Sequence, residues 1–237
     1  MSELPVDFAV IGFPKCGTTA LIRSLMQSGD IHIGMLNNSI ESDITALKGV
    51  KPPDGFFAED KINGHNFSAY VFSTHKIRML TEMNDNCRLI LCVRNPLLSL
   101  LSWHRMHVKI ANGPLSYHFA SVERDFFADC TIESYYSKFA QSRLQYHMYF
   151  HRLLGIVPAD RILIVWQSRM AEEMQAVMNA CASFLGFEAP VLAYQSPHVG
   201  FADRCEVHVA GIISAELSLV HEKLRSLIFD SGVIEVA

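Results

Sequence analysis

Three short hydrophobic runs stand out from an otherwise mixed sequence, and each has the length of a buried strand. They lie within Phe8–Ile11, Arg88–Val93 and Arg161–Trp166. A continuous apolar run of about four to eight residues is typical of a parallel strand that is covered on both faces. A shorter run at Phe56–Ala58 favours a further strand at a sheet edge.

Between these runs, apolar residues recur at the spacing that places them on one face of a helix. The predicted helices are Ala20–Ser28, Ala69–Met83, Leu97–Val108, Ile132–Leu154, Met170–Leu185 and Ser214–Phe229. Pro190–Asp203 is expected to be a loop, and the pattern assigns no element to Leu115–Thr131. The alternation of strands and helices predicts an α/β protein with a mainly parallel sheet and helices on both faces. We expect a single domain over residues 1–237, without repeats or linkers.

Composition narrows the possible partners. The chain has 237 residues, of which 50% are hydrophobic, and a formal net charge of −4. No basic field favours nucleic acid, and no apolar run approaches the ~20 residues that cross a bilayer. The first residues lack the basic start and apolar core of a secretory signal. The six cysteines form no C-x-x-C pair and are expected to be free thiols. We therefore expect a cytoplasmic protein that binds neither nucleic acid nor membrane.

The first hydrophobic run leads into a glycine-bracketed loop and then a predicted helix. Gly12 and Gly17 are separated by four residues, and Thr18-Thr19 follows. A loop of this kind before a helix N-terminus binds anions through backbone N–H groups and the helix dipole. The spacing is close to that of the nucleotide-binding loop G-x-x-x-x-G-K-[ST]. However, Thr18 occupies the lysine position, and the loop has its only lysine at Lys15.

A second candidate anion site follows the second hydrophobic run. The strand predicted at Arg88–Val93 is followed by Arg94-Asn95-Pro96, and Ser102 lies eight residues after Arg94. An arginine at the carboxyl end of a parallel strand points to the crevice where α/β folds bind ligands. A kinase or ATPase needs a carboxylate at a strand end to hold magnesium. Asn95 takes that place here, which favours group transfer without a metal.

These two segments together resemble the signatures of sulfotransferases that use 3′-phosphoadenosine 5′-phosphosulfate (PAPS). Pro14-Lys15-Cys16-Gly17-Thr18-Thr19 is similar to the 5′-phosphosulfate loop P-K-x-G-T-T of that family. Arg94-Asn95-Pro96 with Ser102 is similar to its R-[ND]-P motif and the serine that follows it. The resemblance covers about Val6–Gly186. It implies transfer of a sulfuryl group from PAPS to a hydroxyl or amine of a small-molecule or carbohydrate acceptor, without a metal cofactor and with adenosine 3′,5′-bisphosphate (PAP) as product.

The resemblance also implies roles for individual residues. Lys15 would meet the oxygen that bridges sulfur and phosphorus, where negative charge develops during transfer. The residues Gly17–Thr19 would bind the 5′-phosphate, while Arg94 and Ser102 would bind the 3′-phosphate that distinguishes PAPS from ATP. In this family the mixed segment 31–54 often lies over the acceptor pocket.

The general base remains open at this level. Family members use a glutamate in E-K-S or a histidine in K-T-H, and this sequence offers Glu59-Asp60-Lys61 and then His65. Asp60 matches the acid–lysine adjacency, whereas His65 lies at the expected distance before Arg94. Glu59 and His75 are further candidates. Lys61 would contact the transferring sulfonate.

The resemblance also suggests two further contacts to PAPS, which rest on less specific sequence features. Trp166 ends the third hydrophobic run, where cytosolic family members have an adenine-contacting tyrosine before an acidic residue, and Gln167 replaces that acid. A tryptophan at this place either stacks on adenine or belongs to the core. Arg204 is a candidate for a further 3′-phosphate contact.

Two other functional classes fit the sequence less well. One is a P-loop nucleotide kinase, against which Thr18 and Asn95 argue, and which would depend on magnesium. The other is a PAPS-binding protein without activity, against which the presence of Lys15, Arg94 and Ser102 argues.

Overall fold

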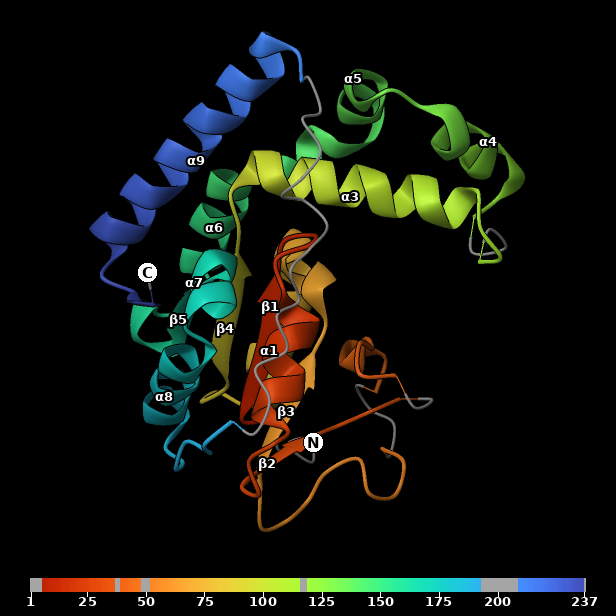
Figure 1. Ribbon diagram of the computed structural model, residues 1–237. Coiled ribbons are helices and arrows are strands. Elements are labelled where there is room, and N and C mark those ends of the chain that lie inside the picture. Colours follow the sequence, from red (N-terminus) through yellow and green to blue (C-terminus); the bar gives the residue numbers. More distant parts are fainter. Residues whose placement is uncertain (1–5, 37–38, 48–51, 116–118, 193–208, 237) are drawn as a thin grey trace.

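Six parallel strands form one central sheet in the computed structural model, which describes residues 6–36, 39–47, 52–115, 119–192 and 209–236 (Figure 1). The strands are β1 Phe8–Gly12, β2 Ile31–Ile33, β3 Ile62–Asn66, β4 Arg88–Val93, β5 Ile162–Trp166 and β6 Ile234–Val236. Their order is β2-β3-β1-β4-β5-β6, and all neighbouring pairs are parallel. The predicted fold class is therefore confirmed.

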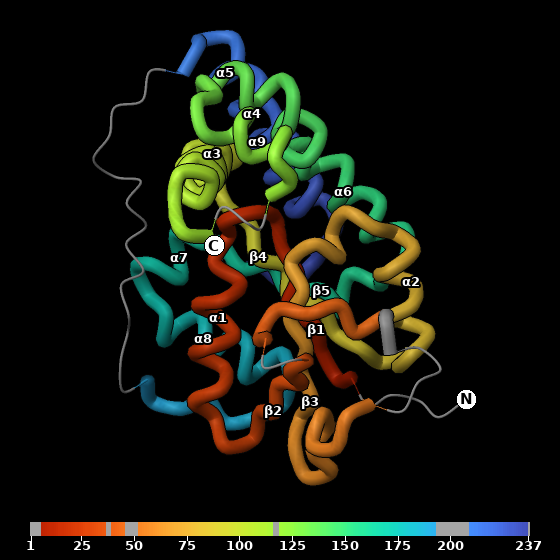
Figure 2. The backbone as a smooth tube through the Cα atoms, turned by 90° about the vertical axis from the view of Figure 1, so that its right-hand side faces the viewer, coloured from red at the N-terminus to blue at the C-terminus, as the bar shows by residue number. Residues whose placement is uncertain are grey.

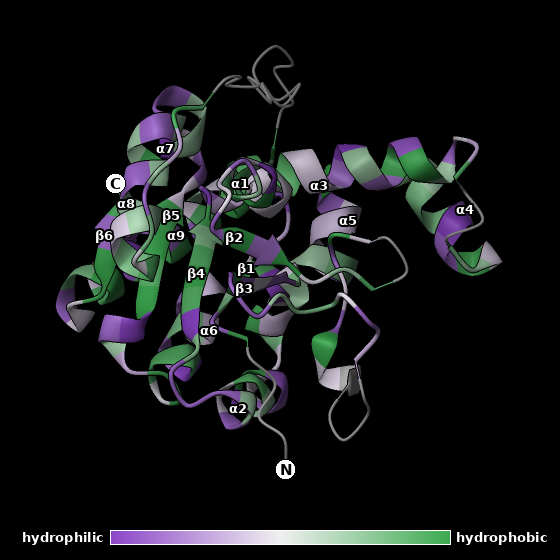
Figure 3. Cartoon of the chain, turned by 90° about the horizontal axis from the view of Figure 1, so that it is seen from below, coloured by the Kyte–Doolittle hydropathy of each residue, from purple (hydrophilic) through white to green (hydrophobic). Residues whose placement is uncertain are grey.

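Helices cover both faces of this sheet. They are α1 Thr18–Leu25, α2 Thr74–Met83, α3 Pro96–Ala111, α4 Ser121–Asp129, α5 Ile132–Tyr135, α6 Tyr146–Leu154, α7 Gln167–Glu172, α8 Met174–Leu185 and α9 Gly211–Ser231. Helices α1 and α8 lie on one face, and α2 and α6 lie on the other (Figures 2 and 3). Helix α9 packs against α6 and α3. Within the described ranges, none of the helices is long and apolar enough to cross a membrane.

The three strands predicted from hydrophobic runs are the middle of the core. Every residue of β1 and β5 is buried, and so is all of β4 after Arg88. Strand β1 pairs with β4 over its whole length, from Phe8 opposite Arg88 to Gly12 opposite Cys92. Burial of each large aliphatic side chain stabilises the fold by about 1.5–3 kcal/mol. These strands thus form a rigid base for the loops that follow them.

Some predicted elements are wrong or incomplete. The residues Phe56–Ala58 form a bend after a turn rather than an edge strand, and the Phe56 ring is buried against Gly34. A Cβ atom added to Gly34 would lie 2.7 Å from Phe56 Cζ. This run is therefore hydrophobic because Phe56 is buried in the core, not because the run forms a strand.

The predicted helix over residues 69–83 begins one residue earlier as a 3₁₀ turn, Ser68–Phe72, and continues as α2 after a break. The break lies at Ser73, whose side chain caps α2 by accepting a hydrogen bond from Lys76 N at 3.3 Å. The long helix predicted over residues 132–154 is divided into α5, a π-helical segment Tyr136–Ala140, a 3₁₀ turn Ser142–Leu144 and α6.

The topology places a crevice between β1 and β4. The chain leaves β1 through α1 and returns to the sheet on the β3 side, whereas it leaves β4 through α3 and returns at β5 on the other side. Adjacent strands whose connections diverge in this way create a ligand-binding crevice at their carboxyl ends. Helix α3 crosses this edge of the sheet (Figure 1).

Candidate functional site

The loop between β1 and α1 turns sharply at two residues with positive φ. Lys15 has φ 63° and Gly17 has φ 88°, and Lys15 is the only non-glycine residue with positive φ among the described residues. A Cβ atom at Gly17 would also lie 2.8 Å from Met170 Cε. Helix α1 begins directly afterwards at Thr18. The first N–H groups of a helix lack intrahelical acceptors, so this turn presents donors suited to an anion.

Residues from the start of α3 and the end of β4 hold this loop in place. Arg94 Nη1 donates a hydrogen bond to the Lys15 carbonyl oxygen at 3.2 Å, and Ser99 Oγ donates to the Pro14 carbonyl oxygen. Asn95 caps α3 by accepting from Leu97 N at 2.9 Å. The two motifs identified in the sequence are therefore in direct contact. Because Arg94 is 9% exposed, its guanidinium is fixed beside the loop.

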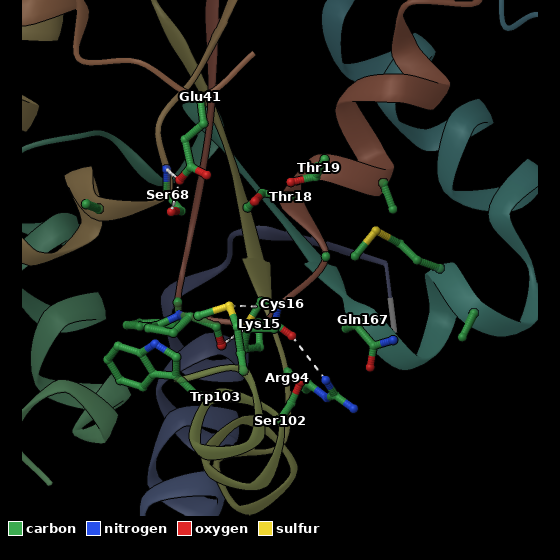
Figure 4. Close-up of a pocket in the computed structure, with 18 of the residues that line it drawn as sticks. Lys15, Cys16, Thr18, Thr19, Glu41, Ser68, Arg94, Ser102, Trp103 and Gln167 are labelled. Atoms are coloured by element: carbon green, nitrogen blue, oxygen red, sulfur yellow. Dashed lines mark hydrogen bonds between the residues drawn. The ribbon is translucent and has the colours of Figure 1, made fainter. Parts of the chain in front are cut away.

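Both motifs line one cavity of about 630 Å³ at the crevice. Its walls include the loop residues Phe13, Pro14, Lys15, Cys16, Gly17, Thr18 and Thr19 together with Arg94 and Ser102. Figure 4 shows Arg94, Ser102 and Gln167 on one side of the loop, with Thr18 and Thr19 at the start of α1. The structure thus brings together the residues expected to bind the 5′- and 3′-phosphates of a nucleotide.

The electrostatics of this end of the cavity favour an anion. Burial and the neighbouring Arg94 charge lower the pKa of Lys15, although Glu41 opposes the shift. Lys15 Nζ lies 3.5 Å from Met106 Sδ. Within the described residues, the ion pairs of the protein do not include Lys15. A negatively charged ligand would therefore relieve the repulsion between Lys15 and Arg94. Burial raises the pKa of the Cys16 thiol to about 12, so the thiol stays protonated.

The opposite end of the cavity has a different lining. Glu41 and Ser68 lie there. The lining of the cavity as a whole also includes Arg143 and the apolar side chains of Phe13, Phe72, Trp103 and Met106. Glu41 Oε1 accepts hydrogen bonds from Ser68 Oγ and, at 3.2 Å, from Ser68 N. Figure 4 shows the Glu41–Ser68 pair on the side of Lys15 that faces away from Arg94 and Gln167.

The residues predicted as base candidates lie elsewhere. None of Glu59, Asp60, Lys61, His65 and His75 lines the cavity. Asp60 has 82% of its side chain exposed and lies 4.0 Å from Lys61 Nζ. His65 is fully buried in β3, where its Nε2 bonds to the Ser42 carbonyl oxygen at 2.5 Å. Burial lowers the pKa of His65 to about 4.

Trp166 lies at a smaller neighbouring cavity of about 230 Å³ rather than at the main one. Its indole Nε1 donates to Glu235 Oε1 at 2.5 Å, and its ring packs against His221. Arg94 and Gln167 line both cavities, and Arg225 of α9 lines the smaller one. Arg204 lies outside the described residues.

The sequence interpretation therefore missed several cavity residues: Glu41, Ser68, Trp103, Arg143, Gln167 and Arg225. No local motif surrounds Glu41, which follows β2 in the mixed segment that was expected to lie over the acceptor pocket. The place of Gln167 directly after β5 is a signal that could have identified it, because strand ends line the crevice. Nothing in the sequence around Arg225, beyond the helical periodicity of α9, indicated that it lines a cavity.

Comparison with known proteins agrees with this geometry. The family model described as Sulfotransferase domain matches residues 5–198, so the chain belongs to the sulfotransferase domain family. A search of curated proteins found no match.

Solved sulfotransferase structures share the fold. A sulfotransferase from Alicyclobacillus acidocaldarius superposes with a TM-score of 0.67 at 17% identity, covering 94% of this chain and 95% of that one. The sulfotransferase domain of the olefin synthase from Synechococcus PCC 7002 gives 0.55 at 13% identity, covering 91% and 94%. Mouse sulfotransferase SULT7A1 complexed with PAP gives 0.55 at 14% identity, covering 98% and 68%.

Proposed function

We propose that the protein transfers a sulfuryl group from PAPS to a hydroxyl group of a small acceptor. The observation that carries this proposal is the shared cavity of the Lys15 loop and the Arg94–Ser102 pair. A donor with phosphate groups at both its 3′ and 5′ positions needs two anion sites, and the cavity offers two. Membership of the sulfotransferase domain family and the PAP-bound mouse neighbour support this choice of donor.

In this proposal, the phosphosulfate lies on the β1–α1 loop. The N–H groups at Gly17, Thr18 and Thr19 bind the 5′-phosphate, since the helix N-terminus supplies both donors and a favourable dipole. Arg94 and Ser102 bind the 3′-phosphate. Gln167, which lines both cavities, contacts the nucleoside.

Lys15 carries the main catalytic role. As the acceptor oxygen attacks sulfur, the bond between sulfur and the 5′-phosphate oxygen breaks and leaves charge on that oxygen. A cation at this position stabilises the transition state more than the ground state, which is the requirement for catalysis. The lysine is partly desolvated, so its charge acts with less screening than at an open surface.

An acceptor screen with PAPS tests the proposal, with PAP release as the readout. Release that depends on both PAPS and an acceptor supports it. Thermal unfolding gives a second measure, because PAP at 100 times its Kd should add about 2.7 kcal/mol of stability. Equal stabilisation by ATP, or PAP release that is absent with every acceptor tested, would argue for another function.

A further inference from the structure

Glu41 is the only acidic residue among the described residues that line the main cavity, and no histidine lines it. It comes from the segment after β2, which carries no recognisable motif. Transfer to a hydroxyl group requires that its proton be removed, and the base must reach the acceptor oxygen directly or through one water. The site residues described so far bind or stabilise the donor, so the proton acceptor is missing from them.

The surroundings of Glu41 fix one of its two carboxylate oxygens. Oε1 accepts from both the backbone N and the hydroxyl of Ser68, while no hydrogen bond to Oε2 is recorded within the described residues. Ser68 belongs to the same 3₁₀ turn as Phe72, which contributes to the apolar wall. The carboxylate is therefore held beside the wall with one oxygen left to accept a proton.

The strand that ends beside this turn does not provide an alternative. Strand β3 ends in Asn66, which is fully buried and cannot accept a proton. His65 is engaged with the Ser42 carbonyl oxygen beneath the segment that carries Glu41. Asp60 is directed to solvent and lies away from the cavity lining.

The apolar wall indicates the kind of acceptor. Phe13, Phe72, Trp103 and Met106 line the same cavity as Glu41, and Lys15 Nζ contacts Met106 Sδ. Aromatic side chains bind flat apolar groups well. A phenol or another apolar alcohol fits this lining, with its hydroxyl between Glu41 and Lys15.

On the basis of the proposed function, we propose that Glu41 is the general base and that the acceptor is a phenol or apolar alcohol. The acceptor O–H proton passes to the Glu41 carboxylate while the acceptor oxygen forms its bond to sulfur. The bond from sulfur to the 5′-phosphate oxygen breaks, and its electron pair leaves with PAP beside Lys15. Glu41 then releases the proton to solvent, to which it is exposed.

Glu41→Gln tests this role, with Glu59→Gln as the matched control at an exposed position outside the cavity. With PAPS and 4-methylphenol, we expect Glu41→Gln to lower kcat by ~10²–10⁴, the usual contribution of a general base. The control should match the wild type. PAP affinity, measured by calorimetry, should be the same in all three proteins.

A second acceptor distinguishes the loss of general-base catalysis from structural damage caused by the substitution. 4-Nitrophenol is far more acidic than 4-methylphenol and is already partly ionised at neutral pH, so it needs less help from a base. Its turnover by Glu41→Gln should fall at least ~10-fold less than that of 4-methylphenol. Ser68→Ala should show a smaller loss with the same dependence on the acceptor, since Ser68 acts only by positioning Glu41. Equal losses with both phenols, or wild-type turnover of 4-methylphenol by Glu41→Gln, would overturn the assignment.

If the wild type turns over neither phenol, the affinity of the PAP complex for 4-methylphenol tests the inference instead. 4-Methylphenol titrated into the PAP complex should bind the wild type and bind Glu41→Ala ~10-fold more weakly, as expected for loss of a hydrogen bond to a charged group. Equal affinities, or no binding to the wild type, would contradict the inference. A wild type that does not bind PAP at all would instead contradict the proposed function.

Discussion

The two ends of the main cavity are built in different ways. The proposed donor end consists of a continuous loop and a strand-end motif, with Lys15 and Arg94 among its charged groups, and both follow central strands of the sheet. Arg94 and Ser99 fasten the loop through its carbonyl groups. An anion can be bound largely by backbone N–H groups and a few cations, so a short local sequence is enough to specify this end.

The rest of the cavity lining, which we propose holds the acceptor, combines side chains from four separate segments. Glu41 follows β2, Ser68 precedes α2, Trp103 belongs to α3, and Arg143 lies in the turn before α6. The segment that carries Glu41 is fastened from below by His65. This end has no backbone motif, and its shape depends on tertiary packing. The comparison shows why the donor is easier to recognise from the sequence than the acceptor.

The largest expected effect comes from the donor end. Lys15→Ala should lower kcat by ~10²–10³, the usual cost of removing one electrostatic stabiliser of a transition state. PAP binding and folding should change less, because the charge that Lys15 meets develops only during transfer. Single-turnover kinetics with a confirmed acceptor, combined with PAP calorimetry, separates the two effects. Near-normal turnover would show that the loop does not bind a phosphosulfate.

Lys15→Arg is the matched comparison for this variant. A planar guanidinium does not occupy the position of a compact ammonium, so we expect only partial recovery of kcat. Full recovery would indicate that charge alone matters at this point of the loop.

The free energy of unfolding should depend on pH through His65, which lies under the segment that carries Glu41. The pKa of His65 is lowered from 6.5 to about 4 by burial, so the folded state binds fewer protons than the unfolded state between these values. Its contribution to stability is therefore complete above pH 6.5 and is lost as the pH falls towards 4. By linkage, the loss should reach about 2 kcal/mol near pH 5.

Urea unfolding of the wild type and His65→Gln at several pH values measures this effect. Glutamine keeps a donor for the Ser42 carbonyl oxygen but does not titrate, so its stability should fall less steeply between pH 6.5 and 4. His107, whose pKa burial also lowers to about 4, contributes equally to both proteins and cancels in the difference. Parallel pH profiles would argue against the role of His65 under this segment.

The smallest effect is expected at the acidic turn before β3. Asp60→Asn should keep kcat within about twofold of the wild type and change stability by less than about 0.5 kcal/mol, because its side chain is exposed and outside the cavity. A large loss of kcat in the same PAPS assay would restore Asp60 as a candidate base and weaken the case for Glu41.

The strands that could be predicted from the sequence are those buried as continuous apolar runs, β1, β4 and β5. Strand β3 is also buried, but its sequence is Ile-Asn-Gly-His-Asn, so hydrophobicity gave no signal. Gly64 makes room for the Phe8 ring, since a Cβ atom there would lie 2.1 Å from Phe8 Cζ. Asn63 bonds to Ala58 N at 2.8 Å and to Ala58 O at 2.9 Å. Asn63 is therefore buried with its side chain satisfied by a neighbouring loop, whereas the buried amide of Asn66 has no hydrogen-bond partner among the described residues.

The residues of the candidate site likewise could be predicted where a local sequence pattern specifies them, and could not where tertiary contacts do. The positions around Lys15 and Arg94 could be predicted because strand–loop–helix order places them at one edge of the sheet. Glu41 could not, because its approach to the cavity depends on contacts with Ser68, 27 residues later in the chain. The sequence distance from Arg94 favoured His65, yet the pleat and packing of β3 turn that side chain into the core.

The most direct test of the account is whether Arg94 recognises a 3′-phosphate. Calorimetry would compare PAP with adenosine 5′-monophosphate, which lacks that group, in the wild type and in Arg94→Ala. The wild type should prefer PAP by ~10–100-fold, the value of one or two hydrogen bonds to a charged group. Arg94→Ala should lose most of this preference while its affinity for the monophosphate changes little. The same preference for PAP in both proteins would contradict a PAPS site at this crevice.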